Sequence, residues 1–357
     1  MSEPKQNAVY SIQLLRGLAA LFVVLFHARP MLNDYAGLGD RLFVHGYIGV
    51  DIFFIISGFI FQHVTRPTTT PGNFMMRRII RILPMYLVAV VVLYLALGDY
   101  SVRSFFSAVL RTAIFLPNAN ENPPFFGYAF LSAGWTLIYE MAFYAIFAAA
   151  LFFSRRFYSV IVCGAIVSLT IIPQLVITGS ITLQPDRAPL MPHAYLGVIT
   201  NPMMLEFVIG VVLAAAYRQK AFTVVLRPAV GIGCIVAAIA LVASGAASGH
   251  GPVNFGLPAL LVTFAALCLE PLVRNHLGGI ALAVGAGSYS LYLFHQPAFA
   301  MVKPLVDGLP AWGTFVTSIG AAIALAMVAY RLLERPIVHF GRSLSQRNRR
   351  PLVFAGE

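Results

Sequence analysis

The sequence contains few charged residues. Asp, Glu, Lys and Arg together make up 10% of its 357 residues, whereas an ordinary soluble domain carries about 25%. Hydrophobic residues make up 59%, and the mean hydropathy is +0.82. So few polar groups cannot cover the surface of a soluble globule of this size. The composition also excludes a disordered chain, a coiled coil and a collagen. A polytopic membrane protein remains.

Cysteine is scarce as well. The three cysteines, Cys163, Cys234 and Cys268, lie inside apolar runs and follow no metal-binding spacing. We therefore expect no disulfide framework, no zinc site and no other bound metal. In such runs cysteine serves as a small hydrophobic packing residue.

Acidic residues are fewer than basic ones, 13 against 24, which gives a formal net charge of +11. In a soluble chain this excess would suggest a nucleic-acid partner. In a membrane protein, however, basic residues first mark the cytoplasmic loops. We therefore expect the lipid bilayer, and no nucleic acid, as a partner.

Long apolar runs are abundant. A bilayer core needs about 20 apolar residues per helix, and ten runs of the sequence approach or exceed that length. They cover residues 10–31, 44–65, 82–98, 133–153, 157–178, 203–217, 224–246, 254–271, 280–299 and 311–333. The run 101–117 carries two arginines, which favours a helix at the membrane interface. The predicted fold is an all-α polytopic protein with about ten transmembrane helices. Residues 1–340 form its transmembrane domain, and residues 341–357 form a basic cytoplasmic tail.

The basic residues divide unevenly between the two sides of this predicted bundle. Sixteen Lys and Arg residues fall on the side of the termini and six on the opposite side, and two lie within spans. The six are Arg29, Arg41, Arg103, Arg111, Arg187 and Lys303. The positive-inside rule therefore predicts that both termini are cytoplasmic.

Two ionisable residues, Arg16 and His27, lie in the first predicted helix. Such groups are costly in hydrocarbon and are functional candidates by default. Eleven residues make three turns plus roughly 20°, so the two side chains share a face about 16 Å apart along the axis. A dry site would keep His27 neutral, as a general base must be. The alternative is that Arg16 snorkels to the interface and His27 is only hydrogen-bonded within the bundle.

Three other predicted spans contain polar groups. Asp51 lies in the second span, Glu140 and Tyr144 in the fourth, and Tyr292 and His295 in the ninth. A buried carboxylate must be paired or protonated, and an Arg or His from another span is the natural partner of Glu140. Any one of these residues could simply join helices. Two histidines, two carboxylates and one arginine in one bundle favour a functional site.

Arg77, Arg78 and Arg81 precede the third predicted helix. An ordinary positive-inside cluster would explain them. Guanidinium groups also bind phosphate oxygens through two parallel hydrogen bonds. The alternative prediction is therefore a site for a cytoplasmic, phosphate-bearing cofactor.

Seven sequence blocks occur in order along nearly the whole chain. They are Arg16-x10-His27, GVDIFFIISGF at 49–59, FMMRRIIRILPMY at 74–86, WTLIYEMAFY at 135–144, NPMMLEFVIG at 201–210, SYSLYLFHQP at 288–297 and Glu334-Arg335-Pro336. With these blocks the chain resembles the acyltransferase 3 family of bacterial membrane acyltransferases. It looks most like the exopolysaccharide O-acetyltransferase branch of that family.

The resemblance implies an activity. Such an enzyme moves an acyl group, most often acetyl, from cytoplasmic acyl-CoA to a hydroxyl of an extracytoplasmic or lipid-linked glycan. The expected co-substrate is therefore acetyl-CoA, the acceptor is a glycan or lipid-linked oligosaccharide, and the location is the bacterial inner membrane. Residues 341–357 are too few for the hydrolase-like domain that some relatives carry, so we expect transfer by the membrane domain alone.

The resemblance also implies roles for residues. His27 matches the catalytic base or transient acyl carrier, and Asp51 and Glu140 match acidic family positions. The donor's phosphates are expected near Arg78 and Arg81, with help from Arg16 and Arg77. Substrate contacts are expected from Trp135, Tyr144, Tyr292 and His295. Acceptor choice is expected in the loops 117–128 and 179–193, which are rich in amides and aromatic residues.

Two other functions fit parts of the pattern. A secondary transporter or flippase of a lipid-linked sugar would also use intramembrane Arg, His and Glu. Such proteins commonly have repeated halves, and no duplication is visible here. A non-catalytic scaffold would have no use for buried ionisable residues. The sequence does not indicate an oligomeric state.

Overall fold

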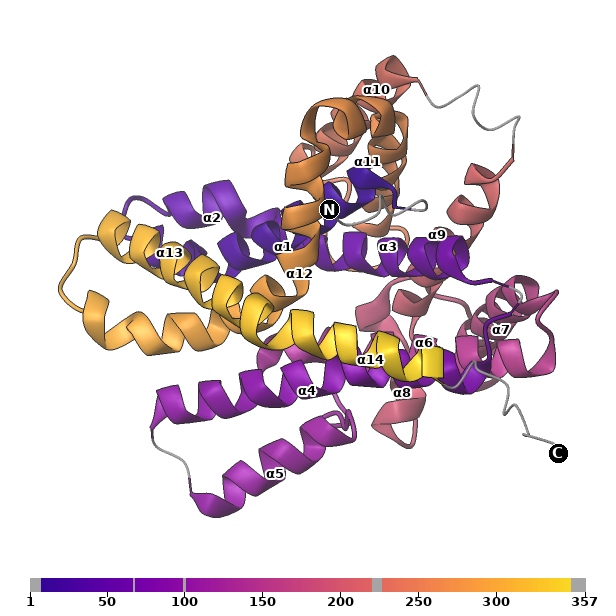
Figure 1. Cartoon of the computed structure of the whole chain (residues 1–357), viewed down its shortest axis with the longest axis horizontal. Helices are drawn as coiled ribbons and strands as arrows, with labels where there is room; N and C mark the ends of the chain where they lie inside the picture. Colours follow the sequence, from indigo (N-terminus) through magenta and orange to yellow (C-terminus); the bar gives the residue numbers. More distant parts are fainter. Residues whose placement is uncertain (1–7, 67, 99–100, 220–226, 348–357) are drawn as a thin grey trace, which may run out of the picture.

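The computed structural model describes residues 8–347, apart from 67, 99–100 and 220–226. Within those limits every regular element is a helix, as Figure 1 shows. The predicted all-α class is therefore confirmed. Lys5, Lys220 and most of the basic tail 341–357 lie outside the described residues.

The α-helices are numbered along the chain. They are α1 (Tyr10–Ala28), α2 (Leu38–Phe43), α3 (Ile48–Val64), α4 (Pro71–Leu97), α5 (Val102–Ala113), α6 (Trp135–Phe153), α7 (Tyr158–Thr178), α8 (Ala194–Thr200), α9 (Leu205–Tyr217), α10 (Pro228–Ala243), α11 (Gly256–Cys268), α12 (Glu270–Val306), α13 (Ala311–Ala329) and α14 (Arg335–Arg347). Short 3-10 turns join several of them: η1 (Arg29–Leu32), η2 (Val44–Tyr47), η3 (Ser132–Gly134), η4 (Pro185–Arg187) and η5 (Pro202–Met204). A π-helical turn, η7 (Tyr330–Glu334), connects α13 to α14.

Many of these helices are apolar enough to cross a membrane. Seven stretches meet the length and hydropathy that a span requires: Tyr10–Leu32, Leu38–Val64, Pro71–Leu97, Ser132–Phe153, Tyr158–Thr178, Glu270–Val306 and Ala311–Gly341. The pair Ala194–Thr200 and Pro202–Tyr217 qualifies together with a bend of 45°, and α10 and α11 are shorter apolar helices. The protein is therefore a multi-pass membrane protein. Each of the ten predicted runs falls on one of these stretches, while the number that cross and the side of the termini remain predictions.

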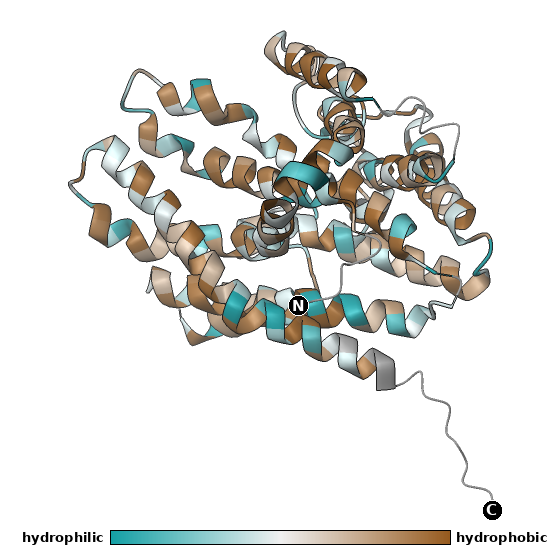
Figure 2. Cartoon of the chain, turned by 45° about the horizontal axis from the view of Figure 1, so that its top comes forward, coloured by the Kyte–Doolittle hydropathy of each residue, from teal (hydrophilic) through white to brown (hydrophobic). Residues whose placement is uncertain are grey.

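Apolar side chains cover the outside of the bundle. Figure 2 shows hydrophobic residues along most of the helical ribbon. Large apolar side chains are openly exposed on several helices, for example Phe152, Val176 and Leu305. In water such a surface would aggregate, whereas in a bilayer it faces lipid.

The third predicted span is longer than its apolar run. The helix α4 begins at Pro71 instead of residue 82, so the arginines of the 77–81 cluster are helical. Thr70 caps this end, because its side chain accepts a hydrogen bond from the Asn73 backbone N–H, and proline is favoured in the first turn. The run 101–117 forms α5, an amphipathic helix that is capped by Ser101.

The helices α1, α3, α9 and α12 form the centre of the bundle. The helix α1 packs against α3 and α12, and α3 packs against α9. Glycines allow the α3–α9 contact: a Cβ at Gly58 would meet the backbone oxygen of Phe207, and one at Gly210 would meet that of Ile55. Small residues let transmembrane helices approach this closely. The helix α14 lies along α4 (Figure 1).

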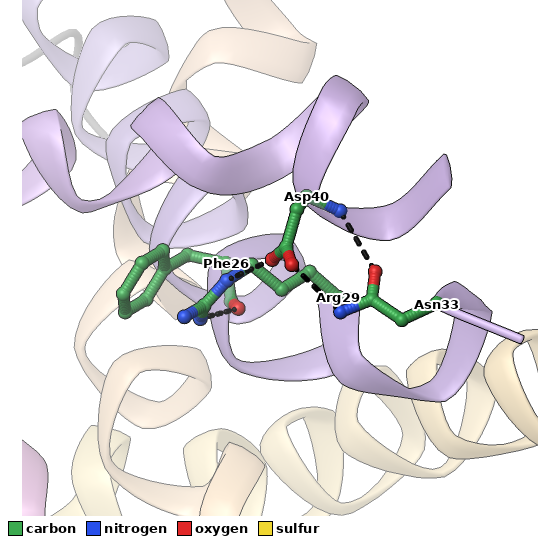
Figure 3. A network of polar contacts seen from close by, with 4 residues as sticks. All are labelled: Phe26, Arg29, Asn33 and Asp40. Atoms are coloured by element: carbon green, nitrogen blue, oxygen red, sulfur yellow. Dashed lines mark hydrogen bonds and ion pairs between the residues drawn. The ribbon is translucent and has the colours of Figure 1, made fainter. Parts of the chain in front are cut away.

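A polar network fixes the end of α1 (Figure 3). The Arg29 Nε donates to Asp40 Oδ1 at 2.9 Å, and another guanidinium nitrogen donates to the Phe26 backbone oxygen at 2.7 Å. Asn33 donates to Asp40 and accepts from its backbone N–H. These bonds tie α2 to the turn of α1 that carries His27.

Candidate active site

Two polar cavities lie inside the bundle. We call them the arginine cavity and the histidine cavity, after the residues that line them. The polar residues of the arginine cavity are Arg16, Ser57, Arg78, Arg81, Thr136, Glu140, Tyr144, Tyr289 and Tyr292. Those of the histidine cavity are His27, Tyr47, Tyr128, Ser132, Trp135, Gln184, Asp186, Arg187, Ser248, His250, Asn254 and Tyr292.

The arginine cavity gathers three guanidinium groups around one carboxylate. Glu140 accepts hydrogen bonds from Tyr144 and from Ser57, the latter at 3.4 Å. No ion pair within 4.0 Å joins Glu140 to an arginine in the described part of the chain, so the expected ionic partner is replaced by two hydroxyl groups. The cavity keeps an excess of positive charge, which suits an anionic ligand.

Arg78 lies between the arginine cavity and a neighbouring cleft. Its guanidinium carbon lies 4.5 Å from the centre of the Phe61 ring, which holds the planar group in place. Its buried Nε has no hydrogen-bond partner among the residues that the structure describes. Arg78 lines both the arginine cavity and a small cleft that also contains Arg77 and Asn73. Arg77 therefore lies beside the arginine cavity, whereas Arg16, Arg78 and Arg81 line it.

The histidine cavity is larger, with a volume of about 500 Å³ against about 80 Å³ for the arginine cavity. Ligand pockets typically have volumes of about 300–1,000 Å³. Both loops that the sequence singled out reach this cavity. Phe125 and Tyr128 come from the first loop, and Asp186 and Arg187 from the second.

His27 lines the histidine cavity and uses one ring nitrogen for a backbone contact. Its Nδ1 lies 2.8 Å from the Val23 backbone oxygen. Because a carbonyl oxygen only accepts, Nδ1 carries the proton and Nε2 is left with a free lone pair. A neutral imidazole in this tautomer has the electron pair that a general base or nucleophile uses.

His295 lies behind His27. The centres of the two rings are 4.9 Å apart. The His295 side chain is fully buried, and its Nδ1 donates to the Tyr292 backbone oxygen at 2.7 Å. Its Nε2 has no partner in the described chain. The structure therefore brings together two histidines from the first and ninth predicted spans, with only His27 at a cavity wall.

Tyr292 separates the two cavities. It lines both of them, as does Val50. The Tyr292 hydroxyl donates to the Ala133 backbone oxygen at 3.0 Å and lies 2.7 Å from the Thr136 hydroxyl. Arg16 and His27, on one helix, thus line two cavities that meet at Tyr292.

The three other predicted residues, Trp135, Tyr144 and Asp51, differ in their position relative to the two cavities. Trp135 lines the histidine cavity and Tyr144 the arginine cavity. Asp51 is fully buried and lines neither. It accepts hydrogen bonds from His250 Nδ1 at 2.8 Å and from the Gly251 backbone N–H at 3.0 Å. Asp51 thus contacts a residue of the cavity lining, His250.

Sequence reasoning missed two residues of this region, His250 and Glu206. His250 follows the apolar run 224–246, outside the predicted spans, so the search for ionisable residues within spans did not include it. Glu206 lies in an apolar run and is fully buried. As an ionisable residue within a predicted span, it met the criterion that singled out Glu140. Over the described ranges, no group of three or more His, Cys, Asp or Glu residues is arranged to hold a metal ion.

The comparisons with known proteins agree with one another. The chain matches the acyltransferase domain family over residues 9–331. It is 29% identical to the exopolysaccharide production protein ExoZ of Rhizobium meliloti, over 90% of this chain and 96% of that protein. It is 25% identical to the acyltransferase MdmB of Streptomyces mycarofaciens, over 94% of this chain and 91% of that protein. It is also 24% identical to the O-acetyltransferase OatA of Staphylococcus aureus, over 90% of this chain and 56% of that protein. No solved structure matches the chain.

Proposed function

The chain belongs to the acyltransferase 3 family and is a membrane O-acyltransferase, and we propose that it acetylates a glycan hydroxyl with acetyl-CoA as donor. The acceptor is an exopolysaccharide or its lipid-linked precursor outside the cytoplasm. The enzyme lies in the bacterial inner membrane with ten spans and with both termini in the cytoplasm. Residues 1–340 act as one catalytic domain.

The meeting of the arginine and histidine cavities at Tyr292 carries this proposal. A transferase that joins a cytoplasmic donor to an external acceptor needs two compartments with a shared point of reaction. The helix α3 gives their order. Tyr47 and Val50, at its start, line the histidine cavity, and Ser57 lines the arginine cavity. Gln62 and Thr65, at its end, line a cleft with Arg155, Arg156 and Arg218.

The donor enters from the end of α3 at which the cleft lined by arginines lies. The guanidinium groups of Arg78 and Arg81 bind its phosphate oxygens, with Arg77 beside them. Arg16 binds further along the extended arm of the donor. Glu140, held by Ser57 and Tyr144, offsets part of the positive charge and so lowers the repulsion between the arginines when no donor is bound.

The acceptor enters the histidine cavity. Its hydroxyl meets His27 Nε2, while Trp135 and Tyr292 bound the space for the sugar. His27 removes the hydroxyl proton as the sugar oxygen attacks the thioester carbonyl. The carbon–sulfur bond then breaks, and the proton passes to the sulfur, which gives an O-acetyl ester and free CoA. In a second route, His27 accepts the acetyl group first and then passes it to the sugar.

A reconstituted assay tests this function. The full-length protein in lipid nanodiscs would receive acetyl-CoA that is radiolabelled in the acetyl group. The acceptor would be the polyprenyl-linked oligosaccharides extracted from cells that lack this protein. We expect alkali-labile label in the glycan, as an O-acetyl ester requires. Folded protein that binds the oligosaccharide and transfers no label to it, or that only moves it across a liposome membrane, would contradict the proposal.

A further inference from the structure

A second imidazole, that of His250, lines the histidine cavity together with His27. His250 is held by Asp51, whose other carboxylate oxygen is bound by the Gly251 backbone N–H. Because Asp51 only accepts when ionised, it fixes the proton of His250 on Nδ1. In the neutral ring Nε2 is then left with a free lone pair, and no described group is hydrogen-bonded to it. His250 comes from the loop between α10 and α11, so the cavity has one such acceptor on α1 and one on this loop.

Glu206 lies beside Asp51. It is fully buried, and neither of its carboxyl oxygens has a hydrogen-bond partner in the ranges that the structure describes. The side chain of Asp51 and the backbone of Gly251 are its polar neighbours. Two carboxylates in such contact within an apolar bundle cannot both be ionised. A proton on Glu206 would let the acid donate a hydrogen bond to Asp51, which in turn accepts from His250.

Aromatic rings surround His250. The centres of the Tyr47, Trp135 and Phe125 rings lie 4.9, 5.3 and 5.9 Å from that of His250, each with its ring plane steeply inclined to it. Polar side chains, among them Asn254, line the same cavity. Apolar ring faces next to fixed hydrogen-bonding groups suit a sugar, which presents C–H surfaces and hydroxyl groups together.

The position of His250 separates it from the site of acetyl transfer. His27 packs against His295, which contacts Tyr292 at the boundary of the two cavities. The aromatic rings that contact His250 line only the histidine cavity, and Asp51 lines neither. His250 is therefore placed to touch the acceptor and not the donor.

We propose that His250 is an acceptor-binding residue whose Nε2 accepts a hydrogen bond from a sugar hydroxyl other than the one that is acetylated. Asp51 and Glu206 are positioning residues that act through it. The inference rests on the proposed function and adds to it a determinant of glycan specificity. His27 remains the group that handles the transferred proton.

Substitutions at Asp51, His250 and Glu206 differ in their expected effects. In Asp51→Asn, the amide oxygen can keep the Gly251 bond while the NH₂ group donates to His250 Nδ1. The proton of His250 then moves to Nε2, which becomes a donor instead of an acceptor. His250→Ala removes the group altogether. Glu206→Gln keeps a donor to Asp51 in the same shape, and we expect it to behave like the unaltered protein.

The experiment measures steady-state kinetics with saturating acetyl-CoA and varied amounts of the extracted polyprenyl-linked oligosaccharide. His250→Ala and Asp51→Asn should raise the KM for the oligosaccharide about tenfold, as expected for one lost hydrogen bond. They should leave kcat, CoA affinity and acceptor-free hydrolysis of acetyl-CoA unchanged. His45→Ala is the matched control, because this exposed histidine lies near Tyr47 in the chain and lines neither cavity.

A binding measurement keeps the inference separate from the proposed function. In a Trp312→Phe background, Trp135 is the only tryptophan of the chain, and its fluorescence reports oligosaccharide binding without any turnover. The expected result is the same tenfold weakening in His250→Ala and Asp51→Asn, whether or not acetyl transfer is detected. Unchanged binding in both variants would overturn the inference, even with normal acetylation by the parent protein. A fall in kcat at constant KM would instead make His250 a base.

Discussion

The histidines of this protein show how the environment of one residue decides its chemistry. His27, His250 and His295 all have Nδ1 within hydrogen-bonding distance of an acceptor. The rings of His27 and His250 line a cavity, whereas Nε2 of His295 is buried without a described partner. The first two histidines can meet a substrate directly. His295 lines neither cavity and contacts the rings of His27 and Tyr292.

The catalytic role of His27 is testable with two substitutions. Loss of a general base typically lowers the rate by about 10²–10⁴, so His27→Ala should fold and leave the glycan essentially unacetylated. His27→Gln retains an N–H that can donate to the Val23 oxygen, but it accepts no proton at neutral pH and should fail equally. The measurement is acetyl transfer per folded molecule, with His45→Ala as the control. Normal product from a well-expressed Gln variant would show that His27 is structural.

The arginine pair is testable through donor affinity. A hydrogen bond to a charged group contributes about 1.5–3 kcal/mol, so Arg78→Ala or Arg81→Ala should weaken CoA binding about tenfold to hundredfold. Lys should restore it only in part, because an ammonium lacks the planar fork. Calorimetric titration with CoA measures this effect. Arg66→Ala, which removes an exposed arginine that lines no cavity described above, should bind CoA normally. Equal affinity in all variants would reduce the cluster to a topology signal.

Among the elements, the apolar runs of the sequence coincide with apolar helices but do not give the ends of those helices. Hydropathy found the apolar half of α4 and missed the three turns before it, because Arg77, Arg78 and Arg81 lower the average while Thr70 and Pro71 begin the helix. The His27–His295 and Asp51–His250 pairs join residues that are far apart in the sequence. Periodicity along one helix can show that two residues share a face. It cannot show which other helix that face contacts.

The α3–α9 contact gives a prediction about stability. A Cβ at Gly58 would lie 2.1 Å from the Phe207 oxygen, so Gly58→Ala must push the two helices apart. Overpacking of this kind costs about 1–3 kcal/mol, and the thermal unfolding midpoint should fall. Gly233→Ala is the matched control, because a Cβ there meets no atom within 4 Å and alanine favours a helix over glycine. Differential scanning fluorimetry in detergent measures both. Equal midpoints would contradict the close packing.

For the molecule as a whole, composition alone was enough to predict a helical membrane protein, because a bilayer admits few other structures. The candidate donor residues were largely predictable too, since ionisable groups in apolar runs are rare. The residues of the candidate acceptor cavity were harder to predict. This cavity is built from loops, and loop sequences with amides and aromatic residues are common in proteins that bind nothing. Only the fold shows that Phe125, Asp186 and His250 line one space.

The proposed chemistry depends on the orientation of the whole molecule, which the charges predict. Arg155, Arg156 and Arg218 line a cleft near the end of α3, while the histidine cavity lies at its start. The positive-inside rule predicts that the cleft faces the cytoplasm and that the histidine cavity faces outward. A reporter that is active only outside the cytoplasm should therefore be silent when fused after Arg350 or inserted beside Arg155. Inserted at Asn120, in the loop next to the histidine cavity, it should be active. The reverse pattern would put the donor site on the wrong side of the membrane and would exclude the proposed direction of transfer.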